Sequence, residues 1–234
     1  GADALTAGLE PRFSELFERP VAIFPVATGT AANVLSLSSL TPPWGAVLCH
    51  RDAHIEADEC GAPEFFTGGA KLVLLDGAHG KVTPQGLADA VPLGVRFDVH
   101  HVQPKVLSLT QATEAGTVYT VAEVAALAEA AHARGLRVHM DGARFANAVA
   151  HLGCSPAEAT WKAGVDVLSF GGTKNGCLAA EAVVFFDPAL AADFALRRKR
   201  GAQLFSKMRV LSAQLDAYLT DDLWLRLARH ANAQ

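Results

Sequence analysis

Short apolar runs, each too short for a helix of ordinary length, recur along the whole chain. Most of them are apolar at nearly every position, which is typical of strands covered on both faces of a sheet. We therefore predict about seven strands, over residues 21–24, 46–49, 71–75, 105–109, 136–140, 165–170 and 182–186.

Helix start signals lie between most of these runs. Thr120 and Glu123 have the spacing of a capping box that opens an Ala-rich helix, and Gly135 is expected to end it. Ser155-Pro156-Ala157-Glu158 has the same spacing and predicts another helix, and Thr83-Pro84 predicts a third start. Strands that alternate with helices indicate a mostly parallel sheet between two helical layers.

The last predicted strand breaks this alternation. The connection between residues 170 and 182 is too short for a helical crossover, so strand 182–186 is expected to run antiparallel to its neighbour. After Asp187-Pro188 the pattern is helical. The sequence thus predicts an α/β fold of three layers, αβα, with a seven-stranded, mostly parallel sheet.

Composition and charge exclude several classes of function. The chain has 234 residues, of which 50% are hydrophobic, and a formal net charge of −4. This mild acidity gives no electrostatic footprint for nucleic acid or for an anionic membrane. The apolar runs stop far short of the roughly 20 residues of a membrane span, so we expect a cytoplasmic protein. The four cysteines form no C-x-x-C pair and indicate neither a zinc ribbon nor a disulfide framework.

Candidate chemistry is expected beyond the carboxyl ends of the strands, where such sheets bind ligands. Residues 28–33 form a small-residue turn entering a helix, whose free N–H groups and dipole favour a phosphate. Asp141 follows the fifth predicted strand, and a buried carboxylate needs a cation or donors, for which Arg144 is one candidate. Lys174 lies in a glycine-rich turn after the sixth, so Lys174 and Asp141 are expected at one edge of neighbouring strands.

A lysine, a carboxylate and a phosphate-type helix start at one edge are the groups that pyridoxal phosphate requires. The lysine amine binds the cofactor covalently, the carboxylate keeps the pyridine nitrogen protonated, and the helix N-terminus anchors the phosphate. The residues therefore predict a site for pyridoxal 5′-phosphate.

The histidines support an alternative interpretation. His50 and His54 are four residues apart beside carboxylates, a spacing compatible with a metal site, although no third ligand follows at a dependable distance. A metal-dependent hydrolase built on His50, His54 and His139 is a function of another class, and it would show bound metal and no chromophore.

Five segments together carry a likeness to a known family: residues 28–33, 54–66, 110–116, 139–145 and 169–176. The stretches His-Met-Asp-Gly-Ala-Arg (139–144) and Gly-Gly-Thr-Lys-Asn-Gly (171–176) are specific. The chain closely resembles the low-specificity L-threonine aldolases, in the fold type I pyridoxal-phosphate enzymes that also include aromatic amino acid β-eliminating lyases. The resemblance implies an aspartate aminotransferase-like large domain with pyridoxal phosphate and no metal.

The resemblance also implies roles for single residues. Lys174 would carry the cofactor, and Asp141 would contact its pyridine nitrogen. Arg144 would lie beside the cofactor and the substrate carboxylate. His54 would stack on the cofactor ring, and it is our candidate for the base that takes the proton of the substrate hydroxyl or positions that hydroxyl.

Four further cofactor contacts follow from the same resemblance. Gly29 and Thr30 would bind the phosphate. Gln111 and Thr173 would contact the cofactor, although another branch of the family carries asparagine and serine at these two places. Such contacts would complete a cofactor site shared among five segments of the chain.

The implied activity is cleavage of L-threonine, L-allo-threonine and related β-hydroxy-α-amino acids to glycine and an aldehyde, in a homodimer or homotetramer with shared active sites. Residues 1–200 would form the cofactor-binding large domain. Residues 201–234 would lead toward a C-terminal small domain absent from this chain, and Leu223, Trp224 and Leu227 would be exposed. A β-eliminating lyase of the same superfamily and a non-catalytic large-domain fragment are the alternatives.

Overall fold

The computed structural model describes residues 3–94 and 98–234, so residues 1–2 and 95–97 of the predicted unit 1–200 lie outside the described residues. Within the described chain the strands form one sheet in the order β1-β7-β6-β5-β4-β2-β3. The seven predicted strands are confirmed, with ends that differ by no more than two residues. Their bounds are β1 (Ala22–Val26), β2 (Gly45–His50), β3 (Lys71–Leu75), β4 (Gln103–Thr110), β5 (Arg137–Gly142), β6 (Val167–Gly171) and β7 (Glu181–Phe185).

The sheet is mostly parallel, as predicted. Strands β3, β2, β4, β5 and β6 run parallel to one another, and β7 runs antiparallel to both β6 and β1. Asp141 on β5 is level with Ser169 on β6, and Gly171 at the end of β6 is level with Glu181 at the start of β7. The reversed strand therefore begins at the edge where its parallel neighbours end.

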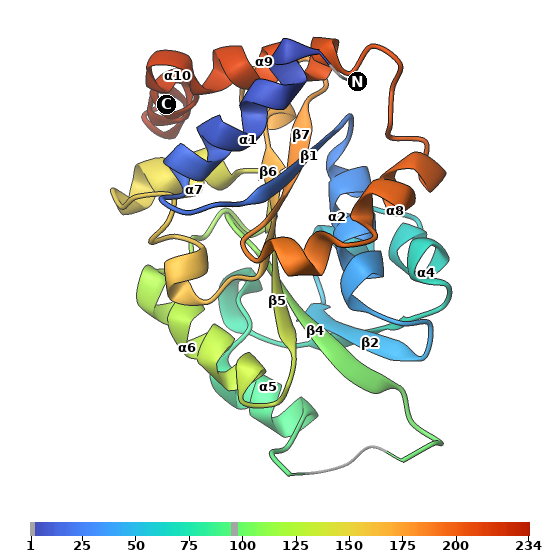
Figure 1. Cartoon of the computed structure of the whole chain (residues 1–234). Helices are drawn as coiled ribbons and strands as arrows, with labels where there is room; N and C mark the ends of the chain where they lie inside the picture. The colour runs from blue at the N-terminus through green and yellow to red at the C-terminus, as the bar shows by residue number, and fades with distance from the viewer. Residues whose placement is uncertain (1–2, 95–97) are drawn as a thin grey trace.

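Helices cover both faces of the sheet and complete the predicted αβα arrangement (Figure 1). One face carries α2 (Gly29–Leu40), α4 (Ala62–Thr67) and α8 (Phe194–Arg200), with the short α3 (His54–Ala57) packed near α2. The other face carries α1 (Ala4–Leu16), α5 (Pro84–Ala90), α6 (Val121–His132), α7 (Phe145–Leu152), α9 (Arg209–Leu219) and α10 (Leu223–Asn232). Short 3₁₀ turns are η1 (Ala78–Gly80), η2 (Trp161–Ala163), η3 (Thr173–Asn175), η4 (Pro188–Ala191) and η5 (Thr220–Asp222).

Local start signals were predicted with mixed success. The capping box of Thr120 and Glu123 is present in both directions, and the Thr83 side chain caps α5. Ser155 and Glu158 also exchange both capping hydrogen bonds, yet the predicted α-helix is wrong. The chain instead forms turns that lead into η2, because it must reverse within a few residues to enter β6.

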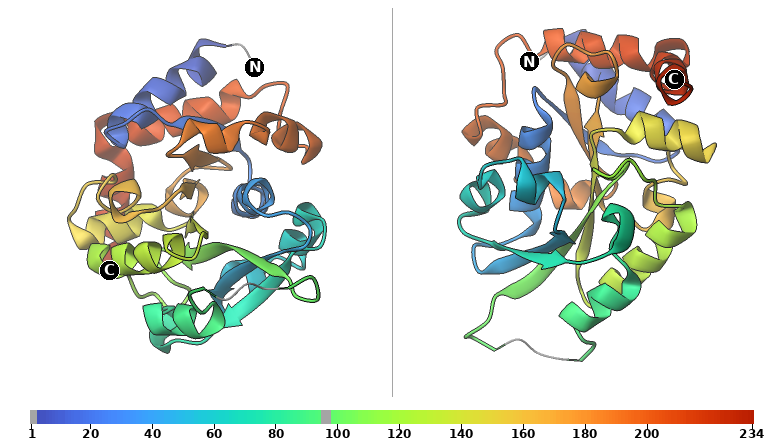
Figure 2. Two further views of the ribbon diagram at one scale, coloured as in Figure 1. Left: turned by 60° about the horizontal axis from the view of Figure 1, so that its bottom comes forward. Right: turned by 180° about the vertical axis from the view of Figure 1, so that it is seen from behind.

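The C-terminal helices belong to the main core. Figures 1 and 2 show α9 beside α1 at one end of the sheet, and α10 packs on α7. Trp224 is 1% exposed and stacks on Phe145 with a ring-centroid distance of 6.2 Å, so its predicted exposure is wrong. Leu223 is half-buried and Leu227 is 36% exposed. A helix turns about 100° per residue, so Leu223 and Leu227, four residues apart, lie on nearly the same side of α10, whereas Trp224 lies about 100° around the helix from Leu223 and enters the core.

None of the helices in the described residues has the length and apolar character needed to cross a bilayer.

Candidate active site

An open cavity of about 330 Å³ lies at the carboxyl-terminal edge of the central strands. Six of the eight predicted site residues line it, and Gln111 and Arg144 do not. The lining comprises Ala27, Thr28, Gly29, Thr30, Asn33, His54, Asp141, Ala143, Thr173, Lys174, Ala179 and Glu181. Residues from five separate segments therefore meet where the sequence predicted a ligand.

The start of α2 forms one wall of the cavity. The Thr28 side chain accepts a hydrogen bond from the N–H of Ala31 at 3.1 Å and caps the helix. The first-turn N–H groups of Gly29 and Thr30 have no acceptor within the helix. The N–H of Ala27 just before them donates to Gln203 Oε1 at 2.9 Å, which fixes the turn. This wall presents the positive end of a 12-residue helix and suits an anion.

Lys174 lies in η3, a turn that follows a very close approach between backbones. A Cβ atom on Gly171 would lie 2.5 Å from the carbonyl oxygen of Ala143, and one on Gly172 would lie 2.5 Å from that of Ala180. Glycine is therefore required at both positions. The glycine-rich turn expected from the sequence is confirmed, and it holds Lys174 next to the loop that follows Asp141.

Asn175 anchors the far end of the same turn. Its amide nitrogen donates to the Tyr218 hydroxyl at 2.6 Å and to the carbonyl oxygen of Trp224 at 2.8 Å. Both partners belong to the C-terminal helices α9 and α10. The position of Lys174 consequently depends on Tyr218 and Trp224, which follow Asn175 by 43 and 49 residues.

Asp141 is held by two N–H donors. It is 3% exposed, and its oxygens accept from the N–H of Ala143 at 3.0 Å and from Asn33 Nδ2 at 2.8 Å. The suggestion that Arg144 is its partner is wrong. Arg144 lies beyond the turn at the start of α7, and its guanidinium faces Glu114 at 3.3 Å.

A second buried carboxylate, Glu59, lies behind this pair. Asn33 Nδ2 also donates to Glu59 Oε1 at 2.9 Å, and the same oxygen lies 2.8 Å from His54 Nδ1. The Glu59 side chain has no exposed surface. Burial raises the pKa of Glu59, the hydrogen bonds from Asn33 and His54 lower it, and the charge of Asp141 raises it further, with a net rise. The four side chains thus form one hydrogen-bonded row from Asp141 to His54.

A third carboxylate, Glu181, closes the turn around Lys174. It is 5% exposed, and its oxygens accept from the N–H groups of Gly172 at 3.1 Å and Thr173 at 3.3 Å. Burial raises the pKa of Glu181, and the hydrogen bonds from Thr173 and Gly172 oppose this rise only in part. From the start of β7, the antiparallel neighbour of β6, Glu181 thus stabilises the backbone of the turn.

The sequence interpretation missed Asn33, Glu59 and Glu181 as site residues. Each leaves a signal in the sequence: Asn33 interrupts an apolar helix start, Glu59 follows His54 by five residues, and Glu181 opens an otherwise apolar strand. A buried polar side chain needs a hydrogen-bond partner, so an isolated polar residue within an apolar run is a candidate site residue.

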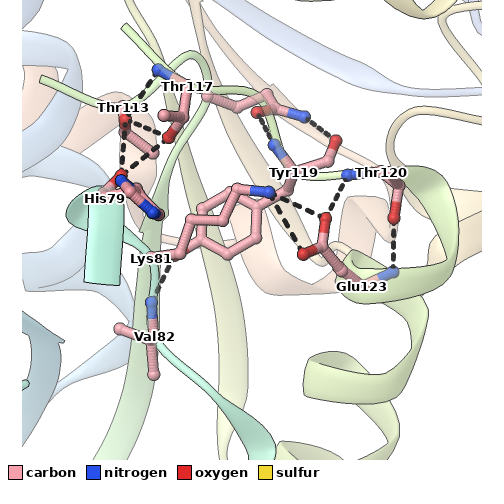
Figure 3. Close-up of polar contacts among 9 residues, drawn as sticks. His79, Lys81, Val82, Thr113, Thr117, Tyr119, Thr120 and Glu123 are labelled. Atoms are coloured by element: carbon pink, nitrogen blue, oxygen red, sulfur yellow. Dashed lines mark hydrogen bonds and ion pairs between the residues drawn. The ribbon is translucent and has the colours of Figure 1, made fainter. Parts of the chain in front are cut away.

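Gln111 serves a nearby loop and not the cavity wall. It is 1% exposed, and its amide accepts from the N–H of Tyr119 at 2.9 Å and donates to the carbonyl of Tyr119 at 2.8 Å. Figure 3 shows the side chain of Lys81 over the Tyr119 ring, with the Lys81 amine paired with Glu123. The Tyr119 hydroxyl accepts a hydrogen bond from the N–H of Val82 at 2.7 Å. Burial raises the pKa of Tyr119 to about 12. Both ends of the Gln111 amide are used in closing this loop.

The three histidines of the metal alternative have separate environments. His139 is fully buried between the hydroxyls of Ser108 and Ser169, at 2.9 and 3.0 Å, and burial lowers its pKa to about 4. His50 Nε2 donates to the carbonyl of Gly77 at 2.9 Å. Among the described residues, no group of three His, Cys, Asp or Glu side chains has the arrangement of a metal site.

Comparison with known proteins identifies the class to which this fold and cavity belong. The profile of the Beta-eliminating lyase family matches residues 1–234, and the chain belongs to that family. It is 51% identical over 232 residues to the low specificity L-threonine aldolase of Pseudomonas aeruginosa, and 50% identical over 232 residues to that of a Pseudomonas species. Each match covers 99% of this chain and 66% of the relative.

A solved structure supports the same relationship. The threonine aldolase of Leishmania major superposes with a TM-score of 0.92 at 28% sequence identity, over 99% of this chain and 67% of that one. The fold of the large α/β unit is thus shared at low sequence identity. The chain spans about two thirds of the length of the relatives it matches.

Proposed function

We propose that this chain is the cofactor-binding large domain of a threonine aldolase, which cleaves L-threonine, L-allo-threonine and related β-hydroxy-α-amino acids to glycine and an aldehyde. One observation carries the proposal: Lys174, Asp141 and the first turn of α2 line a single cavity. The Pseudomonas relatives, named low specificity L-threonine aldolases, support the choice of reaction.

The residues of the cavity fit pyridoxal 5′-phosphate. Lys174 offers the amine for covalent attachment, and Asp141 offers a buried carboxylate to hold a proton on the pyridine nitrogen. The N–H groups of Gly29 and Thr30 would bind the phosphate, and Thr173 would contact the cofactor from the lysine turn. When bound, this cofactor supplies an electron-withdrawing ring that accepts the electrons of the breaking bond.

His54 would act on the substrate hydroxyl. Its Nδ1 faces Glu59, so Nε2 is the ring nitrogen left to meet a ligand in the cavity. Removal of the hydroxyl proton at Nε2 lets the β-carbon become a carbonyl as the Cα–Cβ bond breaks and the aldehyde leaves. A proton returned to the α-carbon then completes glycine.

Arg144 would bind the substrate carboxylate. Its side chain is 36% exposed, and its contact with Glu114 is a long ion pair of 3.3 Å at the protein surface. Such pairs contribute about 0–1 kcal/mol, so the guanidinium can exchange Glu114 for a substrate carboxylate at little cost. Gln111 is not part of the proposed cofactor site, because both ends of its amide are hydrogen-bonded to the backbone of Tyr119.

The proposal includes the assembly and the surroundings of the chain. We propose a homodimer or homotetramer with shared active sites, which would cover exposed aromatic side chains such as Trp44 and Phe65, at 66% and 80% exposure. Residues 201–234 would lead on to a small domain. A cytoplasmic location stays a prediction.

A β-eliminating lyase activity is the second candidate, and the family that matches the chain favours it. The products separate the two reactions: aldol cleavage releases glycine and an aldehyde, whereas β-elimination releases the β-substituent, ammonia and a 2-oxo acid, which is 2-oxobutanoate from threonine and pyruvate from substrates whose β-carbon carries no methyl group. A chain that binds the cofactor and releases none of these products would be a non-catalytic fragment.

The attachment test uses borohydride. Protein incubated with pyridoxal phosphate should show a visible chromophore, and reduction should fix the cofactor covalently at Lys174. The Lys174→Ala variant should lose this labelling, whereas Lys162→Ala, which removes an exposed lysine paired with Glu18, should keep it. Equal labelling of Lys174→Ala and wild type would contradict the assignment of the lysine.

A further inference from the structure

The row of hydrogen bonds from Asp141 to His54 has a defined direction. Asn33 has a single amide nitrogen with two hydrogens, and this nitrogen lies 2.8 Å from Asp141 Oδ2 and 2.9 Å from Glu59 Oε1. Carboxylate oxygens can only accept from it. Asn33 is therefore the donor to both acids, and the opposite amide orientation would place its oxygen against two carboxylates.

The next bond in the row decides the state of the imidazole. Glu59 Oε1 accepts from Asn33 and lies 2.8 Å from His54 Nδ1, so an ionised Glu59 requires a hydrogen on Nδ1. In a neutral imidazole the other ring nitrogen then carries the lone pair. The His54 side chain is 27% exposed and lines the cavity, whereas the Glu59 side chain is fully buried.

We infer that Glu59 is a positioning residue, which fixes the hydrogen of His54 on Nδ1 and so presents a basic Nε2 to the substrate. Asn33 orients Glu59 by donating hydrogen bonds to both Glu59 and Asp141. This inference rests on the proposed function, because His54 is taken there as the base. The carboxylate itself contacts no reacting atom.

Burial makes this pairing strong. Glu59 has one oxygen, Oε2, without a hydrogen-bond partner among the described residues, and the raised pKa of Glu59, caused first by desolvation, shows how costly its charge is there. The Nδ1–H of His54 and the Nδ2–H of Asn33 are its two donors in the described chain. A buried carboxylate with so few donors holds each of them firmly, which restrains both the ring orientation and the tautomer of His54.

The tautomer can be measured without cofactor or turnover. In protein labelled with ¹⁵N-histidine, held at about pH 9 so that imidazoles are neutral, the nitrogen shifts identify which ring nitrogen carries hydrogen. The sequence has nine histidines, so the His54→Phe spectrum assigns the signals of His54. We expect the Nδ1–H form in wild type, and a shift toward Nε2–H in Glu59→Gln because the new amide can donate to Nδ1.

A matched variant separates this effect from a general loss of charge. Glu56 is an exposed glutamate on the same short helix as His54, so Glu56→Gln should leave the Nδ1–H form unchanged. An Nε2–H form in wild type would overturn the inference even if Glu59→Gln failed to fold. An unchanged tautomer in folded Glu59→Gln would also overturn it.

Kinetics give the second readout, with the chain loaded with pyridoxal phosphate. Glu59→Gln should lower kcat by about 10²–10⁴-fold with little change in KM, as expected when a general base is left in the wrong tautomer. A changed tautomer with unchanged kcat would overturn the positioning role. A changed tautomer in a chain whose wild type cleaves no hydroxy amino acid would support the Glu59–His54 relationship and contradict the proposed function.

Discussion

The burial of Trp224 gives a quantitative prediction. Trp224 is 1% exposed, and its ring lies against Phe145, Phe170 and Tyr218 at centroid distances of 6.2, 5.7 and 6.4 Å. Replacing a buried tryptophan by alanine costs about 3–5 kcal/mol, including aromatic contacts of about 0.5–1.5 kcal/mol each. We therefore expect Trp224→Ala to lower the free energy of unfolding by about 3–5 kcal/mol, a large part of the roughly 5–15 kcal/mol of a typical domain.

Urea unfolding followed by circular dichroism measures this loss. Val210→Ala is the control, because Val210 is 54% exposed on α9 of the same C-terminal segment and should cost no more than about 0.5 kcal/mol. Because the Trp224 carbonyl accepts from Asn175 beside Lys174, labelling of Lys174 by borohydride should also decrease. If Trp224→Ala unfolds at the same urea concentration as Val210→Ala, the C-terminal helices do not belong to the core in the way described.

Two further predictions concern buried carboxylates of the cavity. Asp141→Ala should lower the rate by about 10²–10³-fold or more, because a charge that stabilises the transition state is removed; unchanged turnover at saturating cofactor would remove Asp141 from that role. Burial raises the pKa of Glu181 above its usual 4.5. Between pH 4.5 and the raised pKa the folded chain keeps a proton that the unfolded chain has released, so the free energy of unfolding falls as the pH rises through this interval. Glu181→Gln should flatten this fall in urea titrations at a series of pH values, whereas the exposed Glu129→Gln should keep the wild-type slope; a steeper fall in Glu181→Gln would contradict the sign.

Much of the fold follows from local sequence. The strands were predictable because a sheet covered on both faces requires apolar residues at consecutive positions, and α6 because Thr120 and Glu123 satisfy each other within one turn. The segment after Ser155 has the same local signal, but a helix there would leave the chain too little length to return to β6. Local capping decides the start of a segment and tertiary constraints decide how long it continues.

The site was predictable only in part. Asp141 lies near the end of β5, Lys174 and His54 follow the ends of β6 and β2, and each carries a recognisable chemical group. The partners of Asp141 and Glu59 could not be predicted, because Asn33 is separated from them by 108 and 26 residues and meets them only when α2 packs on the sheet. Arg144 was one candidate partner of Asp141 because it is near in sequence, yet its guanidinium faces Glu114.

The pairing of α1 with α9 has a consequence for synthesis on the ribosome. Thr6 bonds to Ser212 and Arg12 to the carbonyl of Asp216, across 206 and 204 residues. At 5–20 residues per second, α1 waits roughly 10–40 s for α9 to be made.

During that interval the first helix lacks this neighbour, although Phe170 and Phe186, which contact Phe13 and Phe17, are made earlier. An isolated helix of 13 residues is marginal in water, and Leu9 and Phe13 of α1, with Phe17 just after it, are fully buried only in the finished fold. The packing of α9 on α1 is therefore a late step of folding on the ribosome, and the aromatic segment at the end of α1 is incompletely covered before it.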